Sequence, residues 1–307
     1  MTDRFDCDGL AVAWASLPRA ALGDVEAAWR ARLDSGEASR FRIFRDYVEG
    51  LSALPGGERE WAASLVVAAA ATPTRMARFR RGEGFIDLPI PPGYGAPPRS
   101  REEVGAALRR LLPGAPRLES AEEVPLKLCA AWSGLGRYGR NNIVNVEGLG
   151  TALTLMGFWS DAASAAPAPG PRFMDRCAGC RLCVAACPTG AIPERQGCID
   201  AERCLSLYNE IDGAFPGWLP GDSHNAAVGC LRCQLACPQD APFRANRLVI
   251  GPFEEGDLAL LLEGRKSPGL DRLIEAMLGR GGEEVLDAYR PVFARNVAAL
   301  LARTGGA

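Results

Sequence analysis

The sequence predicts an α/β (α+β) domain at the N-terminus, followed by a small cysteine-rich domain and a short helical segment at the C-terminus. Helical and strand-like apolar patterns alternate ahead of the cysteines, nine of the eleven cysteines fall within one short stretch, and helical spacing returns after it. A chain of 307 residues is long enough for two or three such parts. The expected bounds are 1–163, 172–248 and 249–307.

The N-terminal domain is expected to contain helices at residues 24–33, 38–54 and 101–112, and strands at residues 64–71, 143–146 and 152–158. In the second helix, the apolar positions at helical spacing are Phe41, Phe44, Tyr47, Val48 and Leu51. We interpret them as core residues, because such a stripe normally faces a protein interior. Residues 89–98 form a loop rich in proline and glycine, and residues 160–172 mark the domain boundary.

Composition and charge limit the classes of partner. The chain is 48% hydrophobic and 23% charged, as expected for an ordinary globular protein. Its net charge of -2 and pI near 5.7 give no global basic footprint for nucleic acid. The longest apolar run, at residues 65–71, is too short for a membrane span and reads as a buried strand. The first residues lack the pattern of a secretory signal, so we expect a cytoplasmic protein without membrane association.

The strongest motif is the cysteine run Cys177-x2-Cys180-x2-Cys183-x3-Cys187-Pro188. This is the spacing of bacterial ferredoxins, in which three close cysteines bind one cubane and the fourth binds the other cluster. Clustered cysteines without a secretion signal also favour metal over disulfides. The run therefore predicts a bacterial ferredoxin-like 2[4Fe-4S] domain. Zinc is the alternative, because paired Cys-x2-Cys motifs also build zinc ribbons, but a structural zinc site has no use for this order.

A second run, Cys230-x2-Cys233-x3-Cys237-Pro238, has the end of the same pattern but lacks its first cysteine. Pseudo-symmetry between the runs assigns the first cluster to Cys177, Cys180, Cys183 and Cys237. It assigns the second cluster to Cys187, Cys230 and Cys233, with one further ligand from Cys198 or Cys204. We favour Cys204, because it opens an expected helix at residues 204–208, whereas Cys198 follows Gly197 in an expected turn.

A glycine-rich segment, residues 134–139, matches the dinucleotide fingerprint G-x-G-x-x-G. That fingerprint requires a strand before it and a helix after it. Here a helical pattern at residues 126–132 precedes the glycines and a strand-like one follows, so a loop that lets a large ligand approach the backbone is the competing interpretation. The only histidine, His224, is expected to have a structural role in preference to one as ligand or proton donor.

Taken together, these motifs resemble epoxyqueuosine reductases. The resemblance is carried by the cysteine order and by the stretches AACPTGA at residues 185–191, RCL at residues 203–205 and GCLRCQ at residues 229–234. The segment GLGRYGRN at residues 134–141 is similar to the same family and to the related reductive dehalogenases. The resemblance covers about residues 125–238.

The resemblance implies a base-off cobalamin held between the N-terminal domain and the ferredoxin module, with the clusters feeding electrons to cobalt. It implies Cys204 as the missing ligand of the second cluster. The family's glycine-rich segment touches the corrin, which suggests five cofactor-binding residues here: Gly134, Gly136, Tyr138, Arg140 and Asn141. A corrinoid requires a roomy crevice.

The chain also departs from this family. Epoxyqueuosine reductases carry an aspartate proton donor ahead of the glycine segment, whereas residues 118–123 here read LESAEE. Glu119 is the candidate catalytic acid, provided that burial keeps its proton, and a solvated surface carboxylate is the alternative. The part after Arg247 is too short for the helical repeats with which the full-length enzymes hold tRNA, which argues against a tRNA substrate.

The sequence thus predicts an iron–sulfur reductase whose two clusters relay electrons to a cobalamin-type cofactor, acting on a small-molecule or unidentified substrate. A ferredoxin- or flavodoxin-type protein is the expected electron donor. The alternative is an electron-transfer protein that docks a partner enzyme and binds no corrinoid.

Overall fold

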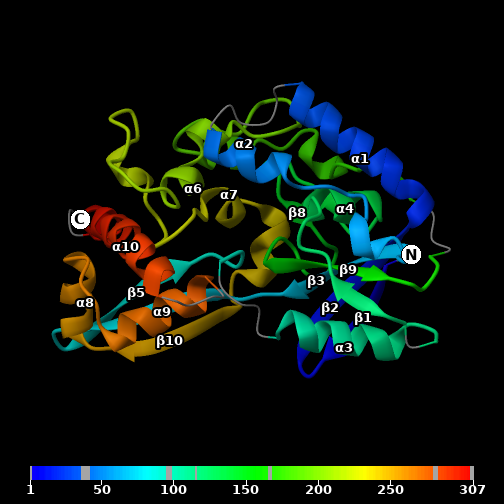
Figure 1. Ribbon diagram of the computed structural model, residues 1–307. Coiled ribbons are helices and arrows are strands. Elements are labelled where there is room, and N and C mark those ends of the chain that lie inside the picture. The colour runs from blue at the N-terminus through cyan, green and yellow to red at the C-terminus, as the bar shows by residue number, and fades with distance from the viewer. Residues whose placement is uncertain are drawn as a thin grey trace. The chain divides into compact units, whose positions relative to one another are not determined.

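A five-stranded sheet and a three-stranded sheet organise the computed structural model, which describes residues 2–35, 42–94, 99–114, 116–164, 168–278 and 283–304 (Figure 1). The chain divides into two compact units. Unit 1 comprises Met1–Ala71, Pro97–Arg181 and Ile192–Glu202, and unit 2 comprises Thr72–Ala96, Leu182–Ala191 and Arg203–Ala307. Neither unit is one continuous stretch, whereas the domains expected from the sequence are continuous. Those domain boundaries stay predictions.

The sheet of unit 1 is antiparallel throughout, with the order β1-β2-β3-β9-β6. Its strands are β1 (Asp3–Cys7), β2 (Leu10–Pro18), β3 (Ser64–Ala71), β9 (Leu153–Ser160) and β6 (Leu118–Ser120). The central strand β3 is buried along almost its whole length. This confirms the buried strand expected at residues 64–71, and β9 confirms the strand expected at residues 152–158.

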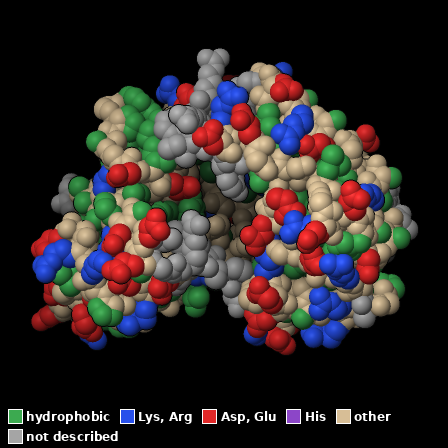
Figure 2. Space-filling model, in the orientation of Figure 1, with side chains coloured by type: hydrophobic (Ala, Val, Ile, Leu, Met, Phe, Trp, Pro, Cys, Tyr) green, Lys and Arg blue, Asp and Glu red, His purple; other side chains and the backbone are tan. Residues whose placement is uncertain are grey.

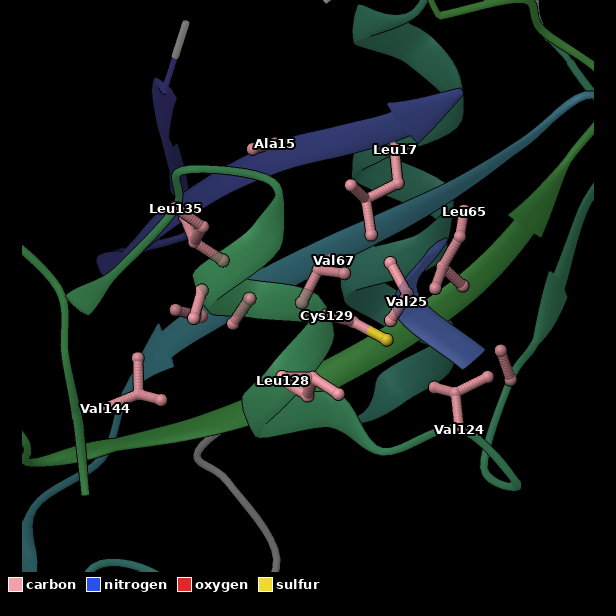
Figure 3. Close-up of a cluster of buried hydrophobic side chains, with 14 of the residues drawn as sticks. Ala15, Leu17, Val25, Leu65, Val67, Val124, Leu128, Cys129, Leu135 and Val144 are labelled. Carbon is pink, nitrogen blue, oxygen red and sulfur yellow. The ribbon is translucent and has the colours of Figure 1, made fainter. Parts of the chain in front are cut away.

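Helices cover both faces of this sheet. Leu65, Val67 and Ala69 of β3 belong to one buried cluster, shown in part in Figure 3, with α1 (Arg19–Asp34) and α4 (Leu126–Trp132). The alternate residues of the same strand, Val66, Ala68 and Ala70, belong to a second cluster with α3 (Arg101–Leu111). The period of two along the strand therefore gives unit 1 three layers, with a sheet between helices.

The expected helices of unit 1 are present with adjusted ends. The helix expected at residues 24–33 begins earlier, at Arg19. Helix α3 begins at a capping box, in which the Ser100 hydroxyl accepts from the Glu103 N–H and the Glu103 carboxylate accepts from the Ser100 N–H. The helix expected at residues 38–54 is described as α2 (Arg42–Glu49). Its residue Val48 is buried, but residues 38–41 and the side chains of Phe44 and Tyr47 lie outside the described residues.

Unit 2 contains a sheet with the order β10-β4-β5. Strand β4 (Thr74–Arg81) is antiparallel to β5 (Gly84–Ile90) and parallel to β10 (Arg247–Phe253). The segment expected to be helical, residues 249–307, therefore begins with the end of a strand. Strand β10 obtains its hydrogen-bond partners from β4, far away in the sequence, and local periodicity does not reveal such a pairing.

The three helices that follow β10 confirm the expected helical C-terminal segment. They are α8 (Glu255–Leu262), α9 (Pro268–Leu278) and α10 (Glu283–Thr304). Their apolar residues form one buried cluster with Ala77 and Phe79 of β4 and Leu88 and Ile90 of β5. Residue Phe293 of α10 is completely buried in this cluster. Unit 2 thus has a core of its own.

Basic and acidic side chains are interspersed on the face of the molecule drawn in Figure 2, as expected for a net charge of -2. No large region of a single sign stands out on that face. In the described part of the chain, no helix combines the length and the apolar character that crossing a bilayer requires.

Candidate metal centre

Short helices carry or adjoin most of the predicted cluster ligands. They are α5 (Leu182–Ala186), α6 (Leu205–Tyr208) and α7 (Arg232–Leu235), with the 3-10 turns Asp175–Cys177 and Pro238–Phe243 at the two ends of the region. Cys183 lies in α5 and Cys233 in α7, and Cys204 is the N-cap residue of α6. The helix expected at residues 204–208 is therefore present. All nine cysteines of the region are partly exposed.

Three of the predicted ligands of the second cluster are neighbours in unit 2. Burial raises the pKa of the Cys204 thiol, and nearby Cys230 and Cys187 raise it further. Burial also raises the pKa of Cys230, to which Cys187 again contributes, although a hydrogen bond from Asn225 acts in the opposite direction. Thiolates that repel one another in a partly buried place are stabilised when a metal neutralises their charge. This donor set fits an iron–sulfur cluster.

Hydrogen-bond donors surround two of these sulfur atoms. The backbone N–H of Ala191 donates to Sγ of Cys187 over 3.3 Å, and the Thr189 hydroxyl lies 3.5 Å from the same atom. The Asn225 amide donates to Sγ of Cys230 over 3.2 Å. Such bonds stabilise a thiolate and tune the potential of a cluster bound to it. Sequence reasoning missed Asn225, and its only signal is a polar residue shortly before a cysteine run.

Cys198, the competing candidate for the missing ligand, belongs to unit 1 and has a different neighbour. Burial raises the pKa of Tyr138 to about 12, Arg32 opposes this rise, and Cys129 and Cys198 add to it. The structure therefore places Cys198 in the surroundings of Tyr138, and Cys204 in those of Cys187 and Cys230. This difference favours Cys204, as the expected helix at its side already did.

The predicted ligands of the first cluster are divided between the units. Cys177 and Cys180 belong to unit 1, whereas Cys183 and Cys237 belong to unit 2. Cys177 ends a 3-10 turn, and its N–H donates to the carbonyl of Met174 over 3.0 Å. Within the residues that the structure describes, no three His, Cys, Asp or Glu side chains converge closely enough to share one metal ion.

The glycine-rich segment lies between α4 and a small hairpin formed by β7 (Arg137–Tyr138) and β8 (Val144–Asn145). Helix thus precedes and strand follows the glycines, which confirms the order expected from the sequence and does not fit a dinucleotide fingerprint. A Cβ on Gly136 would lie 2.4 Å from Cγ1 of Val144 and 2.9 Å from the carbonyl oxygen of Asn145. The close approach at this glycine is made by the protein's own strand β8.

Three of the residues proposed to touch a corrin are buried and engaged within unit 1. The Tyr138 ring packs against Phe173 at 5.9 Å between centroids. In the described part of the chain, the guanidinium of Arg140 donates only to backbone carbonyls, all of them in unit 1. The Asn141 side-chain oxygen accepts from the Ile143 N–H over 3.4 Å. Gly134 differs, because it is exposed and has a φ of +77°, which favours glycine.

Two further candidates have simple surroundings. Glu119 lies on the edge strand β6, where its carboxylate accepts from Nε of Arg117 over 2.8 Å and its side chain is 38% exposed. This is a surface ion pair, not the apolar pocket that holds a proton on a general acid. His224 is buried, with its ring 4.5 Å from that of Phe215, and burial lowers its pKa, as does the charge of Arg295. A neutral, packed histidine agrees with a structural role.

Comparison with known families matches the cysteine region. Residues 176–240 match the family described as "4Fe-4S double cluster binding domain". The chain thus carries the predicted iron–sulfur module, and two [4Fe-4S] clusters are its cofactors. The match bears on the cluster region only.

Curated relatives match stretches of the chain of different length. An "Uncharacterized protein in gldA 3'region" of Geobacillus stearothermophilus is 38% identical over 66 residues, which is 22% of this chain and 30% of that protein. An epoxyqueuosine reductase of Burkholderia pseudomallei is 32% identical over 149 residues, or 46% of this chain and 34% of the relative. The epoxyqueuosine reductase of Escherichia coli is 46% identical over 63 residues, which is 20% of this chain and 16% of the relative. The chain thus spans about a third or less of the length of these relatives.

Solved structures extend the likeness to nearly the whole fold. An epoxyqueuosine reductase from Streptococcus thermophilus gives a TM-score of 0.65 at 19% identity, covering 95% of this chain and 77% of the other. An epoxyqueuosine reductase solved with an epoxyqueuosine-modified tRNA-Tyr stem loop gives 0.64 at 20% identity, covering 94% and 77%. The chain therefore shares the fold of these epoxyqueuosine reductases, with an α/β part, a double-cluster domain and a helical C-terminus, as the sequence predicts.

Proposed function

We propose that this protein is an iron–sulfur reductase whose two [4Fe-4S] clusters relay electrons to a cobalamin-type cofactor in the N-terminal domain. The observation that supports the proposal is the extent of the fold likeness, which covers 95% of the chain and not the ferredoxin-like module alone. A protein that only transfers electrons has no need of so large an additional domain. Cobalamin, when bound, supplies a low-valent cobalt that carries out the reduction.

The residues of unit 1 fit such a ligand at some points and not at others. The side-chain N–H groups of Trp132 and Asn145 are buried and have no hydrogen-bond partner among the described residues. Trp132 ends α4 just before Gly134, and Asn145 lies in β8. Because buried donors are normally paired, both are suited to the amide oxygens around a corrin. The side chains of Tyr138 and Arg140 are already engaged, so their contribution would be to shape the segment.

The reduction also needs a proton donor. Glu119 is the carboxylate that the sequence suggests, but its ion pair with Arg117 is exposed. For Glu119 to serve as the acid, substrate binding would have to exclude water from this edge of the sheet. A Glu119→Gln variant that reduces substrate at an unchanged rate would remove Glu119 from the mechanism.

Anaerobic reconstitution tests the cofactor directly. The purified chain is loaded with iron and sulfide and then incubated with cobalamin, and unbound corrin is removed by gel filtration. We expect about eight irons per chain, a retained corrin absorption spectrum, and a cobalt EPR signal that changes on chemical reduction. Retention of both clusters with no bound corrin would reject the cobalamin part and leave the iron–sulfur assignment intact.

The second candidate is an electron-transfer protein that docks a partner enzyme. A specific observation favours it: Leu182 of α5 and Leu235 of α7 are 51% and 45% exposed. Leu182 directly precedes Cys183, and Leu235 follows Cys233 by two residues. Exposed apolar side chains beside a redox centre suit transient docking. This candidate predicts clusters that exchange electrons with a ferredoxin or flavodoxin while the chain binds no corrin. The same docking surface would serve an electron donor under the first proposal.

The substrate class follows from charge. Relatives named epoxyqueuosine reductase include one solved with a tRNA stem loop. Here the net charge is -2 and the side-chain charges visible in Figure 2 alternate in sign, which favours a small molecule over tRNA. Binding to tRNA that falls steeply with salt would instead support authentic epoxyqueuosine reduction.

A further inference from the structure

Arg140 is a buried arginine in the turn between β7 and β8, with only 3% of its surface exposed. Its guanidinium donates to the carbonyl of Cys177, to that of Cys180 over 3.2 Å and to that of Ala178 over 3.5 Å. It also donates to the carbonyl of Glu194. One side chain therefore holds several backbone oxygens of the loop that carries the first two cysteines of the ferredoxin-like run.

This geometry requires an arginine. A guanidinium offers five N–H donors in a rigid planar fork, whereas a lysine ammonium offers three at one point. The carbonyl oxygens that accept from Arg140 belong to two chain segments, residues 177–180 and residue 194. A single ammonium group cannot donate to all of them equally well. The loop conformation is thus held by the shape of the guanidinium as well as by its charge.

The chain that enters this loop is also attached to the glycine-rich segment. The N–H of Tyr138 donates to the carbonyl of Arg172 over 2.8 Å, and the N–H of Met174 donates to the carbonyl of Tyr138 over 2.9 Å. These are strand-like bonds two residues ahead of Arg140. They lead directly into the 3-10 turn that ends at Cys177. The glycine segment and the first cysteine loop therefore form one hydrogen-bonded element inside unit 1.

Among the residues that the structure describes, every hydrogen bond of the Arg140 guanidinium goes to a backbone carbonyl, and no carboxylate bonded to it neutralises its charge. A buried positive charge that is compensated by dipoles alone keeps a strong local field. Cluster potentials depend on charge and burial around the sulfur atoms. A nearby guanidinium favours the reduced cluster, which carries one more electron.

We propose that Arg140 is a positioning residue of the first cluster: it holds the Cys177–Cys180 loop in its ligand-binding conformation, and its charge raises the reduction potential of that cluster relative to the second. The proposal rests on the predicted ligand set of the first cluster. It does not depend on cobalamin, so failure of corrin binding and failure of this inference are separate results.

The test compares the full-length chain with Arg140→Gln and Arg140→Lys after anaerobic reconstitution. Iron per chain, the rate of iron loss to a chelator and an EPR-monitored redox titration are measured for each protein. We expect Arg140→Gln to lose one cluster several-fold faster and to shift that cluster to a more negative potential, with the second cluster unchanged. Arg140→Lys should restore most of the potential but not the slow iron loss, because it keeps the charge and lacks the fork.

Two controls make the result decisive. Arg137→Gln removes a neighbouring exposed arginine, which pairs with Asp175 over 3.0 Å, and should leave both clusters as in the wild type. A Cys177→Ser variant identifies which EPR signal belongs to the first cluster. Unchanged potential and unchanged iron loss in both Arg140 variants would overturn the proposal, as would an equal effect on both clusters. If Arg140→Gln does not fold, hydrogen exchange of the 177–180 amides in Arg140→Lys decides, with faster exchange expected.

Discussion

The side-chain amide of Asn225 donates a hydrogen bond to Sγ of Cys230 over 3.2 Å, while its oxygen accepts one from the N–H of Leu231 over 2.8 Å. One residue therefore organises the loop before the second cysteine run and touches the sulfur of a predicted ligand. Hydrogen bonds to sulfur stabilise the more reduced, more negative cluster and so raise its potential. The two functions of Asn225 can be separated by mutation.

Asn225→Asp keeps the oxygen that accepts from Leu231 and replaces the N–H donor with a negatively charged oxygen. We expect both clusters to be retained and the potential of the second cluster to become more negative, because a stabilising donor is lost and a like charge is added. A redox titration followed by EPR measures this shift. Asn225→Ala is expected to weaken cluster retention as well, since it also removes the bond to Leu231. Equal potentials in wild type and Asn225→Asp would contradict the assignment of Cys230 to a cluster.

Replacement of Cys204 or Cys198 tests the missing ligand. Cys187 and Cys230 lie near enough to Cys204 to raise the pKa of its thiol, whereas Cys198 raises the pKa of Tyr138. We expect Cys204→Ser to reduce the iron content from about eight to about four per chain, and Cys198→Ser to leave it at about eight. Iron and sulfide analysis after anaerobic reconstitution gives the answer. The reverse pattern would assign the ligand to Cys198.

Cys237→Ser tests the interleaving of the two runs. Cys237 follows Cys233 closely in sequence, yet the ferredoxin pattern assigns it to the cluster bound by Cys177, Cys180 and Cys183. We expect this variant to lose the same EPR signal as Cys177→Ser and to keep the signal that Cys204→Ser loses. Cys129→Ser, a buried cysteine of the unit 1 core, serves as the control and should keep both signals. Loss of the Cys204 signal in Cys237→Ser would show that each run binds its own cluster.

Gly136→Ala tests whether the glycine-rich segment is built for packing. The added Cβ would meet Cγ1 of Val144 at 2.4 Å, so we expect the variant to be less stable by about 1–3 kcal/mol even without any ligand. Thermal or denaturant unfolding of the apoprotein measures the loss. Gly23→Ala in α1 is the matched control, because its Cβ has open space and alanine favours a helix by about 1 kcal/mol. A stability of Gly136→Ala equal to that of the wild type would restore the interpretation as a ligand-binding loop.

Glu26 makes the stability of unit 1 depend on pH. Burial alone would raise the pKa of Glu26, but hydrogen bonds from the Ala53 N–H and from the Arg30 and Ser52 side chains lower it. The folded state therefore binds this proton more weakly than the unfolded state. The resulting stabilisation is complete above the unfolded pKa of about 4.3 and is lost as the pH falls through the lower folded value.

Glu26→Gln removes this dependence. Relative to the variant, the wild type should be more stable at pH 7, and the difference between their unfolding midpoints should shrink as the pH falls below about 4.3. Differential scanning fluorimetry of the two proteins side by side measures it, since acid loss of the clusters affects both equally. A difference that stays constant from pH 7 to pH 3 would show that the charged form has no special role.

Several structural features could be read from local patterns alone. The cysteine spacing predicted the double-cluster module because ligand geometry around a cubane imposes short, fixed intervals on the chain. Helices α3 and α4 and the helical C-terminal segment were predicted because apolar periodicity is contained within each helix. The buried strand β3 was predicted because a strand covered on both faces is apolar along its length. The preference for Cys204 also came from a local helix pattern.

Other features depend on partners far away in the sequence. Strand β10 is exposed at most positions and obtains its backbone hydrogen-bond partners from β4, about 170 residues earlier. Likewise, Arg140 was expected to touch a cofactor, and its carbonyl partners around Cys177 and Cys180 could not be foreseen. An arginine in a glycine-rich segment looks the same in the sequence whether its side chain binds a ligand or a loop of the protein.

The amino-acid sequence by itself determined the fold class and the double-cluster module of this protein, because thiolate spacing and apolar periodicity are local properties of the chain. Only the tertiary structure decided that the Asn225 amide donates to the sulfur of Cys230 and that Arg140 donates to the carbonyls of the first cysteine loop. Hydrogen bonds between distant residues exist only once packing has brought donor and acceptor within about 3 Å of each other, and the order of residues along the chain does not record that distance.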